Sequence, residues 1–178
     1  AGITDGCNVN GDAFCPSRSL TRGQLAKLLT RALRLPATQA DYFSDDDGSV
    51  YESAINAIAD VGITNGCRDG EFCPNAVVTR AELAAFLSRA LELPASSENH
   101  FTDDDESPFH DDVNALAAAR LTYGCDDQMF CPDLEVSRAQ AASFLVRAID
   151  TVARRLEAEA AAWAALLVNH FLTAPRPV

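Results

Sequence analysis

The chain repeats itself with a period of 58 residues, and this repeat constrains the fold more than any other feature of the sequence. The recurring positions are Cys15/Cys73/Cys131, Arg22/Arg80/Arg138, Phe43/Phe101 and Pro36/Pro94. Self-similarity at a fixed period is typical of supersecondary units that stack and share one core. The 178 residues suffice for one compact domain with a substantial core. Because residue 1 falls in the middle of a unit, we expect a half repeat at the start and a longer parent protein.

Apolar residues at helical spacing, together with start and stop signals, predict an all-α fold. The helices are expected at residues 21–33, 49–60, 79–91, 107–120 and from 137 onward. The last helix meets no glycine or proline before Pro175 and is expected to run about 35 residues, or to break near Asp150. Strand propensity is confined to short pieces at 77–78 and 134–136.

Each repeated arginine directly follows a residue that caps a helix. The three capping boxes are Thr21 with Gln24, Thr79 with Glu82, and Ser137 with Gln140. A cation in the first helical turn opposes the helix dipole, so a negative group is expected beside Arg22, Arg80 and Arg138. One interpretation is an external carboxylate or phosphate, held by the guanidinium and by the helix N-terminal N–H groups.

The other interpretation is a structural salt bridge to the acidic loop of an adjoining repeat, at residues 45–47 or 103–105. A second set of arginines, Arg31, Arg89 and Arg147, follows nine residues later, on the opposite face of each helix. We interpret this second set as structural partners of the acidic loops.

The six cysteines form one local pair per repeat. The pairs are Cys7–Cys15, Cys67–Cys73 and Cys125–Cys131. Zinc needs four ligands, whereas each loop offers two sulfurs and no nearby histidine, so we favour disulfides. One disulfide per repeat indicates an oxidising compartment outside the cytoplasm.

Composition argues against several classes of function. The net charge is −12 and the only lysine is Lys27, which argues against a nucleic-acid partner. No run of 18 apolar residues is present, so no membrane span is predicted. The histidines have no nucleophile at a suggestive spacing, and the carboxylates lie in polar loops. A non-catalytic module is therefore predicted.

The acidic loops raise the question of a metal ion. Asp45, Asp47 and Glu52, and in the next repeat Asp103 and Asp105, offer oxygen ligands suited to Ca²⁺. The spacing is not that of an EF-hand, and acids before a helix also favour its dipole. Both interpretations stay open; no other cofactor is predicted.

The last helix carries an apolar stripe of its own. It comprises Leu145, Ile149, Val152, Leu156, Ala160, Trp163, Leu167 and Phe171. Periodicity shows that this face needs covering but does not say by what. The stripe either packs onto this domain or docks on a partner chain, with Leu156, Trp163, Leu167 and Phe171 as the candidate interface.

These motifs together resemble the S-layer homology (SLH) domain family. The resemblance rests on Phe43-x-Asp45, Phe101-x-Asp103, the turn at 62–66, Phe72-x-Pro74 and the box at 78–82. It divides the chain into the second half of repeat 1 (1–36), repeat 2 (37–94), repeat 3 (95–150) and a C-terminal helix and tail (151–178). The cysteine clips depart from the usual family pattern and resemble those of secreted actinobacterial relatives.

The resemblance implies a pseudo-threefold bundle of helical repeats with disulfide-clipped loops. It also implies noncovalent attachment of a secreted protein to anionic cell-wall polysaccharide on a bacterial surface. Carried onto this chain, the ligand contacts fall on Arg22, Arg80 and Arg138, with Thr21, Thr79, Ser137 and Glu82 beside them. The alternative function is a structural subunit of an extracellular assembly, or a homo-oligomer, that docks through the C-terminal helix.

Overall fold

Five helices build the described part of the molecule. The computed structural model describes residues 3–7 and 10–173, with side chains up to residue 163. The helices are α1 (Arg22–Leu33), α2 (Glu52–Asp60), α3 (Arg80–Ala90), α4 (His110–Ala118) and α5 (Arg138–Thr173). Within these residues the predicted strand pieces form only isolated β-bridges, so the all-α class is confirmed. In the same part of the chain, no helix combines the length and apolarity that a bilayer crossing requires.

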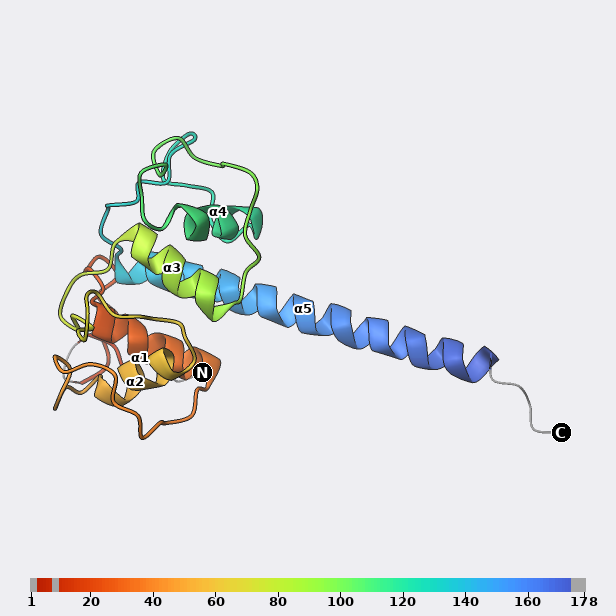
Figure 1. Ribbon diagram of the computed structural model, residues 1–178, viewed down its shortest axis with the longest axis horizontal. Coiled ribbons are helices and arrows are strands. Elements are labelled where there is room, and N and C mark those ends of the chain that lie inside the picture. Colours follow the sequence, from red (N-terminus) through yellow and green to blue (C-terminus); the bar gives the residue numbers. More distant parts are fainter. Residues whose placement is uncertain (1–2, 8–9, 174–178) are drawn as a thin grey trace.

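Two helix pairs of the core are built in the same way, and each pair joins one repeat to the next. Helix α2 packs on α1, and α4 packs on α3, while α1, α3 and the first part of α5 lie at the centre of the body (Figure 1). The residues facing inward are fully buried aliphatic side chains spaced at helical intervals. They include Leu25, Ile55, Ile58, Leu83, Val113 and Leu116, each 0% exposed. This is the stripe pattern expected of helices that bury one face.

A ring of three backbone hydrogen bonds joins the segments that precede the central helices. The N–H of Leu20 donates to the carbonyl of Val136, Val136 donates to Val78, and Val78 donates to Leu20, all at 2.9 Å. All three side chains are 0% exposed. The ring links the repeats cyclically at this level. A pseudo-threefold arrangement of the bundle as a whole remains a prediction.

Two helices begin later than the sequence predicts. Helix α2 starts at Glu52 rather than at residue 49, and α4 starts at His110 rather than at 107. The hydroxyls of Ser49 and Ser107 accept from the N–H groups of residues 51 and 109, so they close a local turn before the helix. Serine serves both in such turns and in helix caps, which is why the sequence did not separate the two.

The three predicted disulfides are confirmed: Cys7–Cys15, Cys67–Cys73 and Cys125–Cys131. The loop of repeat 2 is tightly built around Gly66, which has a φ of 89°. A Cβ at this position would lie 2.4 Å from the carbonyl oxygen of Glu71. Glycine is therefore required where the clipped loop folds back on itself.

Helix α5 continues without a break through Asp150 and leaves the body of the molecule (Figure 1). Along the predicted apolar stripe, Val152 is 37% exposed, Leu156 60% and Trp163 68%. Packing onto this domain, one of the two interpretations above, is correct for Leu145, which is 7% exposed, and wrong for Trp163. Between them, Val152 and Leu156 line an apolar hollow beside α1 and α3. Leu167 and Phe171 lie outside the described side chains.

Candidate functional site: arginines between neighbouring repeats

Each motif arginine reaches from its own helix to the clipped loop of the next repeat. Its Nε donates to the carbonyl of the phenylalanine before the second cysteine, and its guanidinium stacks on that ring. The hydrogen bonds are Arg22 to Phe72 (2.8 Å), Arg80 to Phe130 (2.7 Å) and Arg138 to Phe14 (2.9 Å). The guanidinium carbons lie 4.8, 4.7 and 5.1 Å from the ring centroids. These arginines, 4–7% exposed, therefore join neighbouring repeats.

The N–H groups at the helix starts are already bonded within the protein. In α1, Arg22 N–H donates to the carbonyl of Ala76 and Gly23 N–H to that of Pro74, both at 2.9 Å. Helices α3 and α5 repeat this with the carbonyls of Leu134 and Pro132, and of Arg18 and Pro16. The expectation that these amides converge on an anion is therefore wrong: neighbouring loops occupy them. The arginine side chains remain as the groups that face between the repeats.

The capping residues are likewise engaged. The hydroxyls of Thr21, Thr79 and Ser137 accept from the N–H groups of residues 24, 82 and 140. The side chains of Gln24, Glu82 and Gln140 accept in return from the N–H groups of the capping residues. The predicted boxes therefore form in full, and they fix where each arginine leaves its helix.

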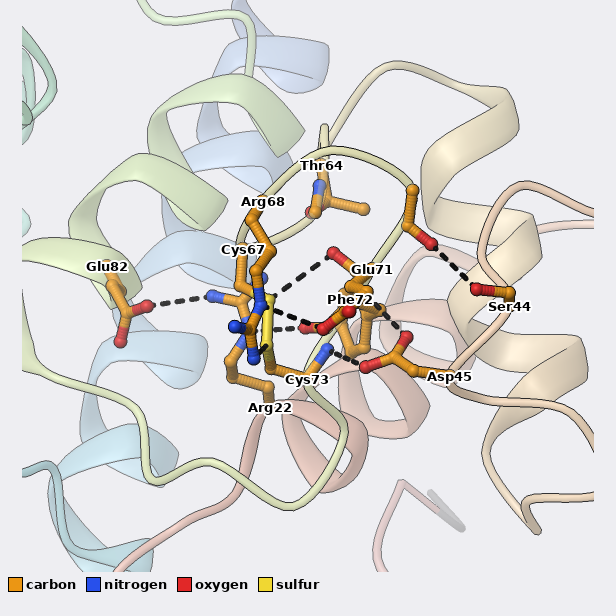
Figure 2. Close-up of a disulfide and its surroundings, with 12 residues drawn as sticks. Arg22, Ser44, Asp45, Thr64, Cys67, Arg68, Glu71, Phe72, Cys73 and Glu82 are labelled. Atoms are coloured by element: carbon orange, nitrogen blue, oxygen red, sulfur yellow. Dashed lines mark hydrogen bonds and ion pairs between the residues drawn. A yellow bond between two sulfur atoms is a disulfide. The ribbon is translucent and has the colours of Figure 1, made fainter.

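The first interface, which we name the Arg22 groove, contains an internal salt bridge. Arg22 Nη1 lies 2.8 Å from Glu82 Oε1 (Figure 2), and the other terminal nitrogen, Nη2, is buried without a hydrogen-bond partner. Burial lowers the pKa of the Arg22 guanidinium, and the charge of Glu82 opposes this shift. The groove, of about 120 Å³, is also lined by Arg89 and Phe109. Here the structural interpretation of the motif arginine is partly correct, although the acid is Glu82 rather than an aspartate.

At the second interface, which we name the Arg80 interface, no carboxylate of the described residues pairs with Arg80. Its Nη2 is buried without a hydrogen-bond partner, and burial lowers the pKa of its guanidinium. The position of Glu82 in the Arg22 groove is taken here by Gln140, which comes 58 residues later. A neutral side chain thus stands where the first interface has its acid.

The third interface, which we name the Arg138 groove, is the most basic of the three. The Nη2 of Arg138 donates to Thr4 Oγ1 and to the Gly6 carbonyl, both at 3.2 Å. The cavity has about 280 Å³ and is also lined by Lys27, Arg31, Asp5 and neutral Gln24. Asp5 lies 3.1 Å from Lys27 Nζ and 2.7 Å from Arg31 Nη1, and these cations lower its pKa to about 2.

The second set of arginines does not pair with the acidic loops at 45–47 and 103–105, so that prediction is wrong. Arg31 pairs with Asp5, Arg89 lies 3.5 Å from Asp112, and Arg147 donates to the carbonyl of Leu121. Arg31 and Arg89 instead line the grooves that receive a motif arginine from another helix. A nine-residue step reverses the helix face, and in a cyclic bundle the opposite face borders the neighbouring groove. The sequence carried this signal, together with the lone lysine at 27, and it was missed.

Three acids of the predicted metal site accept hydrogen bonds from backbone N–H groups. Both carboxylate oxygens of Asp45 accept backbone hydrogen bonds, from Phe72 and Cys73 at 2.7 Å (Figure 2). Asp103 holds the next clipped loop in the same way, at 2.7 and 2.8 Å. Glu52 accepts from the N–H of Gly48 at 2.8 Å. These three acids therefore brace loops.

The fold and the site define a class: a disulfide-clipped helical repeat module whose repeats meet along arginine-lined interfaces. The family model that matches the chain is the S-layer homology domain, at residues 42–84 and 100–142. The chain therefore belongs to the S-layer homology domain family, as its motifs suggested. Family membership and the disulfides support the predicted extracellular, cell-surface location.

Three relatives contain a segment that is similar to this chain. The endoglucanase of Bacillus sp. (strain KSM-635) is 34% identical over 146 residues, covering 77% of this chain and 15% of its own length. The surface-layer 125 kDa protein of Lysinibacillus sphaericus is 30% identical over 115 residues, 64% of this chain and 10% of its length. An S-layer protein of Bacillus anthracis is 28% identical over 141 residues, 75% of this chain and 17% of its length. The chain thus spans a small part of each relative.

Proposed function

We propose that this module anchors a secreted protein noncovalently to anionic polysaccharide of the bacterial cell wall, and that the Arg138 groove is its principal contact. The observation that carries the proposal is the charge of that groove. Arg138, Lys27 and Arg31 line one cavity, and Asp5 is the sole acid among the described residues that line it. An excess of cations around a polar cavity favours a carboxylate, pyruvate or phosphate group of a sugar polymer.

The three interfaces are not equivalent in this proposal. Glu82 already neutralises Arg22, so the Arg22 groove offers less to an anion. The Arg80 interface has an unpaired guanidinium nitrogen but it is fully buried. The Arg138 groove combines the larger cavity with Lys27 and Arg31, whose side chains are 37% and 32% exposed. A repeating polymer can engage more than one interface at once, and such multivalency strengthens weak individual contacts.

A double substitution, Lys27→Gln with Arg31→Gln, tests the proposal. Both side chains are part-exposed, and among the described residues they pair only with Asp5, so their removal costs little stability. Binding to purified cell-wall polysaccharide is expected to fall at least tenfold, which corresponds to about 1.4 kcal/mol, and to depend less steeply on salt. Arg138 is left unchanged because it holds two repeats together.

The matched control replaces two exposed arginines elsewhere, Arg68→Gln with Arg155→Gln, and so makes the same change in net charge. The control variant is expected to bind like wild type. Equal losses in both variants would mean that net charge alone governs binding, and unchanged binding by the Lys27/Arg31 variant would reject the groove.

The relatives include proteins named as an enzyme and as surface-layer proteins, and the chain corresponds to a small part of each. We propose that the repeats themselves are non-catalytic and confer attachment on whatever activity the parent protein carries. Hydrolysis of cell-wall or plant polysaccharide by the purified chain would contradict this assignment.

A second function is supported by the exposure of α5. Leu156 and Trp163, which are 60% and 68% exposed, continue the apolar stripe of α5, and such a face is normally covered. The corresponding hypothesis is a structural subunit of a surface assembly, or a homo-oligomer joined through α5. Light scattering of the full chain and of a chain ending at residue 150 separates the hypotheses. An assembly state that is the same in both removes the support for docking through α5.

A further inference from the structure

One buried acid in repeat 2 has no role in the interfaces described above. Asp46 is 0% exposed, and among the described residues no other residue donates a hydrogen bond to either of its carboxylate oxygens. A buried carboxylate without a partner is costly, so such a group calls for an explanation. Its neighbours Asp45 and Glu52 brace the loop through backbone N–H groups, but Asp46 braces nothing through its side chain.

Asp46 faces two exposed acids. One carboxylate oxygen of each of Asp41, Asp46 and Asp47 lies within 4.8 Å of the others. Asp46 is buried, and the nearby carboxylates of Asp41, Asp45 and Glu52 carry charge of the same sign. Negative groups therefore gather around a desolvated carboxylate, and a positive charge placed among them would relieve both penalties.

The equivalent position in repeat 3 shows how the same acid is accommodated without such a charge. Asp104 is also 0% exposed, but its Oδ2 lies 3.0 Å from Asn114 Nδ2 and 3.3 Å from His110 Nδ1. His110 stands 58 residues after Glu52, so repeat 3 has an imidazole where repeat 2 has a further acid. In repeat 3, Oδ2 of the buried acid therefore has two side-chain partners, although Oδ1 has no hydrogen-bond partner among the described residues. In repeat 2, neither oxygen of Asp46 has one.

We propose that Asp41, Asp46 and Asp47 form a Ca²⁺ site in repeat 2. All three ligands are oxygens, which a hard cation prefers, and Ca²⁺ binds oxygen at about 2.3–2.6 Å. Two ligands on one ion are then at most about 5 Å apart, a span that the 4.8 Å cluster fits. Asp41 and Asp47 are exposed, so they offer the ion its first ligands at the surface, and Asp46 is the buried ligand beneath them. This set keeps only Asp47 from the ligands predicted from sequence.

Calorimetric titration of the full chain with CaCl₂, in metal-free buffer at constant ionic strength, tests the site. We expect one Ca²⁺ per chain, with a dissociation constant of about 10⁻⁴–10⁻³ M, the range of extracellular modules, and a higher melting temperature in its presence. Asp46→Asn and Asp47→Asn are each expected to weaken binding at least tenfold. Asp47 is exposed, so its variant keeps the test valid if Asp46→Asn does not fold.

The matched control is Asp105→Asn, which removes the acid equivalent to Asp47 from repeat 3 and should change Ca²⁺ affinity less than twofold. Absence of binding at about 10 mM Ca²⁺, ten times the weakest affinity expected, would overturn the proposal. So would an Asp47→Asn variant with wild-type affinity, or equal losses for Asp47→Asn and Asp105→Asn, since these outcomes indicate nonspecific attraction to an acidic surface.

Discussion

Replacing Glu82 by glutamine tests whether the salt bridge in the Arg22 groove stabilises the fold and also weakens anion binding by Arg22. The two oxygens of Glu82 do different things: Oε2 accepts from the N–H of Thr79 at 2.9 Å, and Oε1 accepts from Arg22 at 2.8 Å. Glutamine has one acceptor oxygen, so it can close the capping box or answer the arginine, but not both. The Glu82→Gln variant is therefore expected to leave Arg22 without its carboxylate.

The size of the expected loss of stability follows from how deeply the pair is buried. The side chains of Arg22 and Glu82 are 5% and 21% exposed, so the pair is only partly screened by water. Two charges about 4 Å apart attract by about 4 kcal/mol at an effective dielectric of about 20, and desolvation offsets much of that gain. A neutral hydrogen bond in place of a charged one costs about 1–2 kcal/mol net. That loss lowers the melting temperature by about 3–6 °C in a chain of this size.

Chemical denaturation and calorimetry measure this loss of stability. A binding assay with the polysaccharide measures the expected gain in affinity. Because an unpaired Arg22 is free to meet an external anion, Glu82→Gln is expected to bind the polymer more tightly while unfolding more easily. The reverse change, Gln140→Glu, gives Arg80 a carboxylate and is expected to stabilise the chain by about 1 kcal/mol. A free energy of unfolding equal to that of wild type in both variants would refute this account of the interfaces.

Three further changes have defined outcomes. The pKa of Asp46 in the folded protein, about 6, lies above its ordinary value of 3.8, so the contribution of Asp46 to stability is full below pH 4 and is lost as pH rises through 6. In Ca²⁺-free buffer, the free energy of unfolding of Asp46→Asn should exceed that of wild type by about 1–3 kcal/mol at pH 8 and lose that advantage near pH 4. Gly66→Ala should cost more than about 2 kcal/mol because its Cβ meets the Glu71 oxygen at 2.4 Å, whereas Gly70→Ala, with open space around it, should cost about 1 kcal/mol in urea unfolding. Serine at both Cys67 and Cys73 opens a loop with a sequence separation of 6 and should cost about 2–2.5 kcal/mol, measured as a shift of the urea midpoint.

The sequence predicted those parts of the fold that depend on local chemistry. Helix positions follow from apolar spacing and caps, and the boxes at Thr21 and Thr79 form with both of their hydrogen bonds. The disulfides follow from one cysteine pair per repeat. Turns that precede α2 and α4 use the same serine chemistry as a cap, so the starts of these helices were misplaced by three residues each.

What the sequence could not supply is which groups meet across an interface. The Nε atoms of the motif arginines donate to backbone carbonyls of phenylalanines, and any residue has such a carbonyl, so no side-chain pattern marks the acceptor. Burial of Asp46 between two exposed acids is invisible for the same reason: Asp45, Asp46 and Asp47 are identical in sequence and differ only in their surroundings. The long α5 was expected, but its exposure depends on where the other helices end.

The position three residues into each central helix decides what its interface can do. A carboxylate there, as at Glu82, closes the capping box and a salt bridge together, and the arginine becomes structural. An amide there, as at Gln24 and Gln140, still closes the box but gives the facing arginine no carboxylate at this position. Stability and adhesion therefore compete at one position, so a module that must do both gains from dividing the two roles among its interfaces. The single acid at Glu82, beside two amides, is the pattern that this division predicts.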